Sequence, residues 1–530
     1  MMKHPPQGYG KRRRAPARAA MRPTAPPGAP ERVANPERSG TLGVTMRRSI
    51  PALAFVVCIA GPAVTGACGT DDPGVGAAVV PPALPTPPGA EAGDPADSSS
   101  DRATIPDAAL PRGTGDPCRG IPMPLDQHYV PKGMCARVVA ITLNGYRQLT
   151  FAPNGDLFAV TAGGSIVRFK DSDDDGFFQE SEISIYAEGG GNGNNCHIDA
   201  SSGYLYAGSP DGVRRWPWGP NAADGGAGED VVIGEPSSSG HPKHTVHVYD
   251  GYLYVHSGSA DNTGDSKGPD YDDNRSLIRR FKLSSFVPGS PLAWLTGEIV
   301  TSGLRNANGF TKNAAGRMYA VVNGMDGLGY DGVDVHEDNP GEQVVELAPG
   351  KRYGFPFCFT AQRLVSGGQV VAPGTQLPVP GQVHDAAWCA ANSSRPAAFI
   401  QAHSAPLDLT FFDAQPTGGL PERYRGGAFV ALHGSWNREP PTGYKVIWIP
   451  FDDAGNAPMP TSTAAATTFP YETVFGGGSA TGAVDGPWSW ATQTHSDEPR
   501  FAGVAVSPID GALYVTADTG FYIYRVGQPN

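Results

Sequence analysis

An aspartate-rich segment has the residue types and spacing of a calcium-binding loop. Asp171, Asp173 and Asp175 alternate along the chain, Gly176 follows them, and Glu182 comes six residues after the glycine. Alternate residues of a tight turn can direct several carboxylates to one point, and calcium prefers six to eight such oxygen ligands. The flanking residues look like strands, so we expect a structural calcium loop without the EF-hand fold. The alternative is a solvated acidic hairpin.

Three closely spaced histidines are candidates for proton transfer. His241, His244 and His247 precede the strand pattern of residues 251–254. Imidazole accepts and releases protons near neutral pH, which makes histidine the most common general base. The alternative is that all three are surface polar residues on an alternating strand.

The elements that must position these residues form a repeating pattern. A turn that contains glycine is followed by a short strand with alternating apolar residues, and several copies continue into a second strand. A two-strand unit cannot bury its own faces, so the copies must pack around an axis. We therefore predict an all-β, six-bladed β-propeller with insertions at 320–425 and 450–500, with a β-sandwich as the alternative. Residues 138–142 are expected to add the closing strand of the last blade. The six copies lie at 154–158, 203–206, 251–254, 316–319, 426–429 and 511–514.

The composition agrees with a turn-rich β protein. The 530 residues include 70 Gly and 52 Pro, only 17% are charged, and the formal net charge is −12. Glycine and proline punctuate short strands. The negative charge gives no reason to expect nucleic acid as a partner.

The N-terminal part looks like a targeting signal rather than a fold. Residues 1–45 are rich in Arg and Pro, and either reflect a start assigned too early or form a long basic leader. Residues 46–68 have a basic start, a short apolar core and a lipobox-like end at Cys68, with Thr65 where leucine is usual. The alternative is an ordinary signal peptide cut near Ala67. Residues 69–117 have the composition of a disordered tether to the folded part, 118–530. We expect an exported lipoprotein, periplasmic or anchored to the outer membrane of a Gram-negative bacterium, that meets the membrane only through its lipid.

Five cysteines follow the signal segment. Export makes disulfides plausible between Cys118 and Cys135 and between Cys358 and Cys389, which leaves Cys196 unpaired.

Several blocks resemble the soluble glucose/sorbosone dehydrogenases, which use pyrroloquinoline quinone (PQQ) and calcium. Arg305 and Asn306 stand in a stretch similar to the family signature G-x-R-N-x-x-G. Another block resembles G-x-x-Y-G-W-P-x-C, with Phe355 in place of the tryptophan. A further block, which begins with His433, is close to a hallmark of the sorbosone dehydrogenase branch. The five blocks lie in the family's order at 301–309, 323–329, 349–358, 402–407 and 433–446.

The resemblance implies a site at the central mouth of the propeller. Arg305 would contact the quinone oxygens, and backbone carbonyls of Gly324 and Met325 would hold the catalytic calcium. A fixed guanidinium and a divalent cation stabilise the negative charge that a quinone develops. The other residues expected to bind the cofactor are Asn306, Arg438, Lys445 and Arg500.

The resemblance also implies a histidine base in the third blade. The alignment favours His241, with His244 as the alternative. The glucose dehydrogenase branch has an aspartate that orients this histidine, but here Ser259 stands at that position and Asp261 is the nearest carboxylate. Either Asp261 substitutes, or the base is oriented in another way, or activity is reduced.

The function that the resemblance implies is oxidation of a small sugar, with electrons passed to a cytochrome or a quinone. One alternative is a propeller that binds or scaffolds without catalysis. The other is a calcium-dependent, lactonase-like hydrolase, which the position of the aspartate-rich loop on a blade hairpin disfavours.

Overall fold

The computed structural model describes residues 121–122, 128–142, 145–191, 193–236, 240–264, 274–413, 419–457, 471–477, 499–519 and 521–529. The expected N-terminal extension, signal segment and tether all lie outside these residues, as does Cys118.

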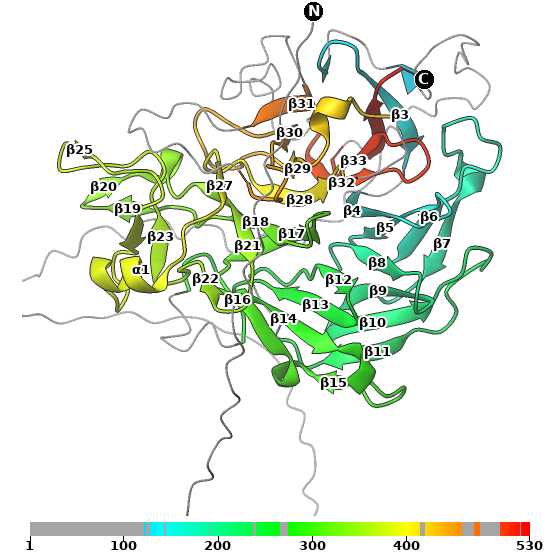
Figure 1. Cartoon of the computed structure of the whole chain (residues 1–530), viewed down its shortest axis with the longest axis horizontal. Coiled ribbons are helices and arrows are strands. Elements are labelled where there is room, and N and C mark those ends of the chain that lie inside the picture. Colours follow the sequence, from blue (N-terminus) through cyan, green and yellow to red (C-terminus); the bar gives the residue numbers. More distant parts are fainter. Residues whose placement is uncertain are drawn as a thin grey trace, which may run out of the picture. The chain divides into compact units, whose positions relative to one another are not determined.

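Six sheets, each with four neighbouring antiparallel strands, form the framework of the described chain (Figure 1). The first has β4 (Tyr146–Phe151), β5 (Leu157–Thr161), β6 (Ile166–Phe169) and β7 (Ile183–Ala187). The second has β8 (Cys196–Asp199), β9 (Tyr204–Ser209), β10 (Gly212–Pro217) and β11 (Glu229–Ile233). The third has β12 (Val246–Tyr249), β13 (Tyr252–Ser257), β14 (Leu277–Lys282) and β16 (Glu298–Ser302).

The other three sheets repeat the arrangement. The fourth has β17 (Asn306–Lys312), β18 (Met318–Asn323), β21 (Glu342–Leu347) and β27 (Ala398–Ile400). The fifth has β28 (Pro406–Phe411), β29 (Ala428–Leu432), β30 (Lys445–Ile449) and β31 (Glu472–Gly477). The sixth has β32 (Phe501–Val506), β33 (Leu513–Ala517), β34 (Tyr522–Gly527) and, from the other end of the chain, β3 (Cys135–Ile141).

The sheets are the blades of a closed ring, so the predicted six-bladed propeller is confirmed. The innermost strand of each sheet lies against the next sheet, and β32 of the sixth sheet returns to β4 of the first. The ring closes inside the last blade, where β3 pairs with β34 in a register that runs from Cys135 opposite Gly527 to Ile141 opposite Tyr522. The predicted closing strand is therefore also confirmed.

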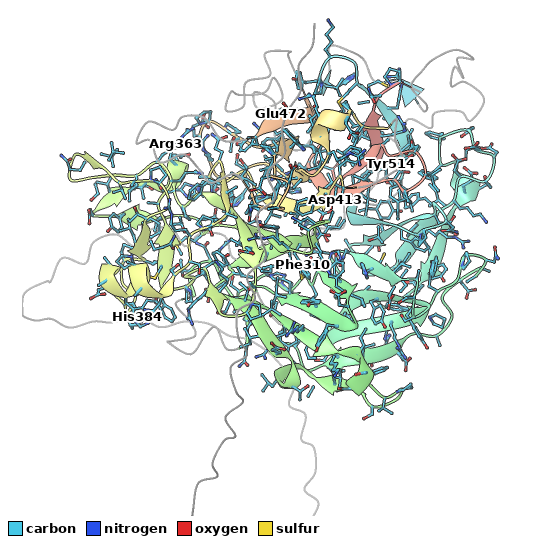
Figure 2. All side chains as sticks on the ribbon, in the orientation of Figure 1. Phe310, Arg363, His384, Asp413, Glu472 and Tyr514 are labelled. Carbon is cyan, nitrogen blue, oxygen red and sulfur yellow. A yellow bond between two sulfur atoms is a disulfide. The ribbon has the colours of Figure 1, made fainter. Side chains whose placement is uncertain are left out.

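The core lies between the blades. Six apolar clusters fill the six interfaces between neighbouring sheets. Figure 2 labels Phe310, in the cluster between the third and fourth sheets, and Tyr514, in the cluster between the sixth and first. Because each sheet is covered on both faces, its strands are apolar nearly throughout, as β5 and β29 illustrate.

Short strands extend four of the sheets. They are β1 (Ile121–Pro122) on β3, β2 (His128–Tyr129) on β31, and, in parallel pairing, β15 (Leu292–Ala293) on β11 and β22 (Lys351–Arg352) on β16. Short 3-10 helices lie at Glu180–Glu182, Leu283–Ser285, Trp294–Thr296, His336–Asp338 and Glu422–Tyr424.

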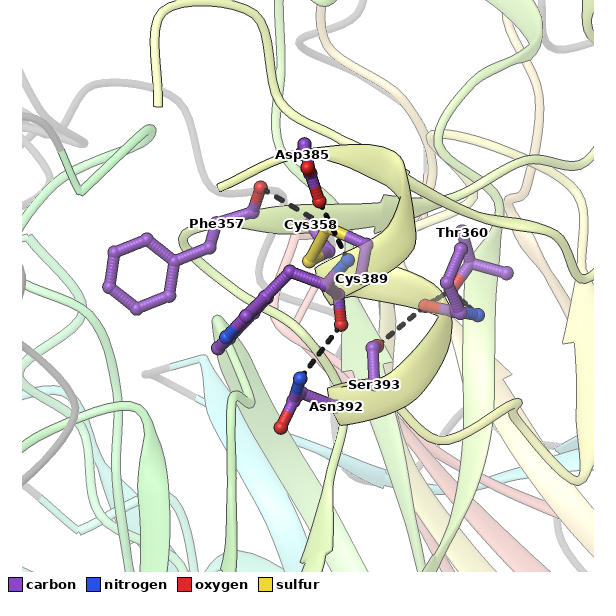
Figure 3. The surroundings of a disulfide bond; sticks show 9 residues. Phe357, Cys358, Thr360, Asp385, Cys389, Asn392 and Ser393 are labelled. Atoms are coloured by element: carbon purple, nitrogen blue, oxygen red, sulfur yellow. Dashed lines mark hydrogen bonds between the residues drawn. A yellow bond between two sulfur atoms is a disulfide. The ribbon is translucent and has the colours of Figure 1, made fainter. Parts of the chain in front are cut away.

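The fourth sheet carries the larger insertion, at the left of Figure 1. Asp385 caps α1 (Ala386–Asn392), where its Oδ1 accepts a hydrogen bond from the Trp388 backbone N–H over 2.8 Å. The disulfide between Cys358 and Cys389 ties this helix to a strand, as Figure 3 shows and as the cysteine pattern predicts. Cys135 is also in a disulfide, and Cys196 is free and buried. The insertion has β19 (Gly329–Tyr330), β20 (Val333–Asp334), β23 (Cys358–Thr360), β24 (Val365–Ser366), β25 (Gln369–Val370), β26 (Gln376–Pro378) and α1 (Ala386–Asn392).

Side chains of the inner strands make hydrogen bonds across the centre of the ring. The Gln148 side-chain amide donates to the backbone oxygens of Asn308 and Leu407, each over 2.7 Å. A cavity of about 440 Å³ is lined by residues from all six inner strands, and His197 and His247 lie in its wall. Within the described residues, no helix has the length and apolar character needed to cross a membrane.

Candidate active site

Two loops of every blade lie at the same end of its sheet. Because neighbouring strands are antiparallel, the loop that enters the first strand and the loop that joins the second to the third share one end. We call these segments the mouth loops. In the third to sixth sheets they include residues 240–245 and 258–264, 303–305 and 324–341, 401–405 and 433–444, and 499–500 and 518–519.

His241 is held in one tautomer by its neighbours in the mouth loops. Its Nδ1 lies 2.8 Å from Oγ of Ser259, and that Oγ lies 2.7 Å from the backbone oxygen of Asp261. A carbonyl oxygen can only accept, so the single hydroxyl proton of Ser259 is donated to it and the His241 Nδ1–H donates to Ser259. Burial, and after it the charge of Arg305, hold the pKa of His241 well below its usual range. The ring is therefore neutral at pH 7, and its Nε2 carries a lone pair.

Arg305 lies beside this histidine and is fixed by the next mouth loops. Its Nε donates to the Asn262 backbone oxygen over 3.0 Å, and one Nη donates to the Asn262 side-chain oxygen over 2.8 Å. The same Nη lies 3.4 Å from a carboxylate oxygen of Asp326. Asn306, the next residue, is buried, and its side-chain oxygen has no hydrogen-bond partner within the described chain. The mouth loops thus bring His241, the favoured base candidate, close to Arg305 and Asn306.

A partly buried ion pair lies next to Arg305. His403 donates from Nε2 to the His336 backbone oxygen over 2.6 Å, and its Nδ1 lies 3.3 Å from Oδ1 of Asp326. Burial lowers the pKa of His403, but Asp326 and Glu342 outweigh burial and raise it overall. For Asp326, burial raises the pKa, and His403 and Arg305 outweigh it in the opposite direction. The pair is therefore an imidazolium and a carboxylate.

Asp326, His336 and His403 bring possible ligand atoms within 4.8 Å of one another, as a metal site would. However, Nδ1 of His336 accepts from the Gly327 backbone N–H over 2.9 Å, and its Nε2 lies 3.2 Å from the Asn437 backbone oxygen. Both rings thus have partners at both nitrogens. The hydrogen bonds account for this cluster without a metal ion.

The loop predicted to hold the catalytic calcium lies in the same region. Gly324 and Met325 directly precede Asp326, and the Gly324 N–H donates to a carboxylate oxygen of Glu342 over 2.6 Å. The other oxygen of Glu342 accepts from the Ala405 N–H over 3.2 Å. Burial raises the pKa of Glu342 to about 7. Glu342 therefore joins the loop of the fourth blade to the turn that enters the fifth.

A second charged cluster connects the mouth loops of the fifth, sixth and first blades. Nε2 of His433 lies 2.9 Å from Oδ1 of Asp518, whose other oxygen lies 3.5 Å from Nε of Arg147. Arg500 donates to the His433 backbone oxygen over 3.2 Å and to that of Gly434 over 2.6 Å. The predicted cofactor residue Arg500 thus stands in a group that also contains Arg147.

Three predicted residues lie in different surroundings. His244 is fully buried, with Nε2 3.2 Å from Glu235 and Nδ1 3.3 Å from the His256 backbone oxygen, so it does not face a substrate. Lys445 is fully buried within β30 and does not reach the surface of the mouth loops. Arg438 is turned to a neighbouring loop, where it donates to the Glu337 backbone oxygen over 2.8 Å and approaches Asp338.

The aspartate-rich loop lies at the opposite end of its blade. It joins β6 to β7, and Asp171, Asp173 and Asp175 bring carboxylate oxygens within 4.8 Å of one another. Glu182 does not join this group, because its Oε1 accepts from the Ser172 backbone N–H over 2.6 Å.

Five residues in or next to the mouth loops were not among the predicted site residues: Asn262, Asp326, Glu342, Asp518 and Arg147. Asp326 lies within the block 323–329 that resembles the family, whereas the other four lie in no such block, and only the packing of neighbouring blades brings them to these clusters. His403 and His433 lie inside blocks that resemble the family, and this resemblance was the sequence signal that could have identified them as site residues.

Comparisons with known proteins identify the family of this chain. A family model described as TrAA12-like matches residues 128–528. A pyrroloquinoline quinone-dependent pyranose dehydrogenase of Coprinopsis cinerea is 29% identical over 349 residues, which are 63% of this chain and 46% of the relative. A pyrroloquinoline quinone-dependent sugar dehydrogenase of Hypocrea jecorina is 26% identical over 356 residues, 62% of this chain and 77% of the relative. The chain thus spans about half the length of the Coprinopsis relative.

Solved structures support the fold. The holo form of the PQQ domain of pyranose dehydrogenase from Coprinopsis cinerea has a TM-score of 0.64 and 24% identity, and the match covers 77% of this chain and 98% of that one. The predicted resemblance to PQQ-dependent sugar dehydrogenases is confirmed, and the chain belongs to the TrAA12-like family.

Proposed function

We propose that this protein oxidises a sugar at a hydroxyl-bearing carbon, with PQQ as its cofactor and calcium as its metal. The observation that carries the proposal is a neutral histidine, His241, with its Nε2 lone pair available, set beside Arg305 and Asn306 in the mouth loops. Family membership supports the same reaction class.

The residues present fit such a cofactor. The unpaired Asn306 oxygen lies near Gly258, whose Cβ, if present, would be 3.4 Å from it, so a buried acceptor is available beside His241. The Asn437 side-chain oxygen, near Asp326, also has no hydrogen-bond partner within the described chain. Arg147 and Arg500 supply the cationic partners that the three carboxylates of PQQ require.

We assign the roles as follows. His241 accepts the proton of the sugar hydroxyl at Nε2, a step that contributes roughly 10²- to 10⁴-fold in enzymes that use it. Arg305, fixed by Asn262 and Asp326, stabilises the negative charge that develops on the electron-accepting side. When bound, PQQ supplies the carbonyl carbon that takes the hydride from the sugar carbon.

Two sites are proposed for calcium. Gly324 and Met325, anchored through Glu342, would hold the catalytic ion by their carbonyls, as in the family that the chain resembles. The three aspartates of the β6–β7 loop would hold a structural ion, which prefers such hard oxygen ligands. An external electron acceptor, export and a lipid anchor at Cys68 also remain proposals.

Reconstitution tests the proposed function. Apo-protein is titrated with PQQ in the presence and absence of calcium, and oxidation of a panel of aldoses is followed with a dye acceptor. We expect saturable, calcium-dependent oxidation of at least one sugar. Failure to bind PQQ would contradict the proposal in favour of a binding propeller, and hydrolysis of a lactone panel without PQQ would favour the hydrolase.

A further inference from the structure

We infer that Ser259 is the positioning residue of His241: its hydroxyl selects the Nδ1–H tautomer and so leaves Nε2 as the proton acceptor. The inference rests on the proposed function and deepens it. It also answers the question that the sequence leaves open, because a serine stands where a related branch has an aspartate.

The direction of the two hydrogen bonds carries the inference. Ser259 is fully buried, so water does not compete for its hydroxyl. The proton of Oγ is committed to the backbone oxygen of Asp261, and Oγ can therefore only accept from Nδ1 of His241. The carboxylate of Asp261 accepts instead from the Gly264 backbone N–H, so Asp261 acts on the histidine through its carbonyl.

The backbone of Ser259 fixes the same geometry. Its carbonyl accepts from the His241 N–H over 2.9 Å, and its N–H donates to the Arg305 carbonyl over 2.8 Å. One residue thus connects the backbone of His241 to the backbone of Arg305. Gly258 permits the close approach, because a Cβ there would lie 2.6 Å from Cβ of His241.

A hydroxyl and a carboxylate differ as orienting groups. A carboxylate on Nδ1 would stabilise the imidazolium, whereas a hydroxyl adds no charge. The charged and titratable groups that act on His241 are Arg305, His256 and Asp326; the first two oppose the imidazolium and Asp326 favours it. We therefore expect a base that stays neutral, and active, below the ordinary pKa of histidine of about 6.5.

The tautomer itself can be measured without cofactor or substrate. Long-range ¹H–¹⁵N spectra of apo-protein labelled at histidine are recorded, and the His241→Ala variant identifies the signal of His241. We expect protonated Nδ1 and bare Nε2 in the wild type, and a mixture of tautomers in Ser259→Ala. Protonated Nε2 in the wild type, or an unchanged pattern in Ser259→Ala, would overturn the inference.

Kinetics of the reconstituted protein provide the second measurement. Ser259→Ala should lower kcat about 10- to 100-fold, with KM and PQQ affinity nearly unchanged, and Ser259→Thr, which keeps the hydroxyl, should recover most of the loss. In Ser259→Asp, the acid limb of the pH profile of kcat/KM should shift to higher pH by roughly one unit or more, because a carboxylate at Nδ1 raises the pKa of the base. Ser276→Ala is the matched control, because Ser276 is equally buried and its Oγ has no hydrogen-bond partner within the described chain.

The proposed function and the role of Ser259 can be disproved separately. If the wild type binds no PQQ or oxidises no sugar, the proposed function is wrong, while the spectra still report whether Ser259 sets the tautomer. If the wild type is active and His241→Ala is not, but Ser259→Ala behaves like Ser276→Ala, the inference alone is wrong.

Discussion

Two histidines three positions apart, His241 and His244, have opposite environments. His241 is partly exposed in a mouth loop, and its Nδ1 is hydrogen-bonded to Ser259. His244 is fully buried, and both of its nitrogens lie near protein oxygens. We therefore expect His241 to serve proton transfer and His244 to support the fold, although the two residues are close in sequence.

Alanine variants should separate these roles. His241→Ala should lower kcat by roughly 10²-fold or more while PQQ still binds, because only the proton acceptor is lost. His244→Ala should keep most of kcat per folded molecule, but lower the free energy of unfolding by about 2–3 kcal/mol, because buried Glu235 loses its partner. Dye-linked kinetics and urea unfolding of both variants make the comparison. Loss of turnover in a fully folded His244→Ala protein would reverse the assignment.

At the scale of the elements, close contact between two mouth loops positions the base. The segment that contains His241 and the segment after β13 approach so closely that glycine is required at two points. At Gly240, φ is +67° and a Cβ would lie 2.3 Å from the Ala260 carbonyl carbon; at Gly258, a Cβ would lie 2.6 Å from Cβ of His241.

Gly258→Ala is expected to displace His241 without altering any catalytic group. Misplacement of a reacting group by about 1 Å can cost 10²-fold, so we expect kcat to fall at least tenfold with the far-UV circular dichroism spectrum unchanged. Gly219→Ala is the control, because a Cβ there meets no atom within 4 Å and φ is not in the left-handed region. Equal activity of the two variants would argue against tight positioning of the base.

The β6–β7 loop should stabilise its blade when it binds calcium. We expect calcium to raise Tm of the apo-protein, and Asp171→Asn to remove most of that shift, because it keeps an oxygen acceptor but removes a charge. Turnover at saturating PQQ and calcium should be nearly unchanged, since this loop lies at the end of its blade opposite the mouth loops. The measurement is thermal unfolding with calcium and with a chelator. An undiminished calcium shift in Asp171→Asn would place the stabilising ion elsewhere.

The sequence predicted the strands and blades better than the side-chain contacts between them. Repeated glycine turns and alternating apolar residues were enough for six blades and for the closing strand, because each blade has its own local pattern. They could not predict the contact of Asn262 with Arg305 or of Asp518 with Arg147, because each of these contacts joins two different blades. For the same reason, alignment could not show that His244 and Lys445 are buried.

At the scale of the whole molecule, Asp518 joins three blades. It contacts His433 of the fifth and Arg147 of the first, and it belongs to the sixth. Burial raises the pKa of Asp518, but the charges of His433, Arg147 and Arg500 outweigh burial and hold the pKa well below its usual range. A depressed carboxyl pKa contributes stability above the unfolded-state value, about 3.9, and this contribution is lost as the pH falls through the folded-state value.

Asp518→Asn should therefore destabilise the fold in a pH-dependent way. We expect the free energy of unfolding to be lower by about 2 kcal/mol at pH 7. The difference from the wild type should shrink below about pH 4, where the carboxyl group of the unfolded wild-type chain begins to take up a proton and the contribution of the folded-state carboxylate therefore declines. Urea unfolding of both proteins at pH 7, 5 and 3 tests this. A difference that stays constant down to pH 3 would contradict the electrostatic explanation.

We propose that His241 and Arg305 serve one redox site in the mouth loops. Single-turnover reduction of the reconstituted protein is the decisive experiment. Protein loaded with PQQ and calcium is mixed with excess sugar without an external acceptor, and the absorbance of the bound quinone is followed. We expect rapid reduction in the wild type and reduction at least about 10²-fold slower in His241→Ala at equal PQQ occupancy. Equal rates in the two proteins, or no reduction of bound quinone by any sugar in the wild type, would contradict this proposal.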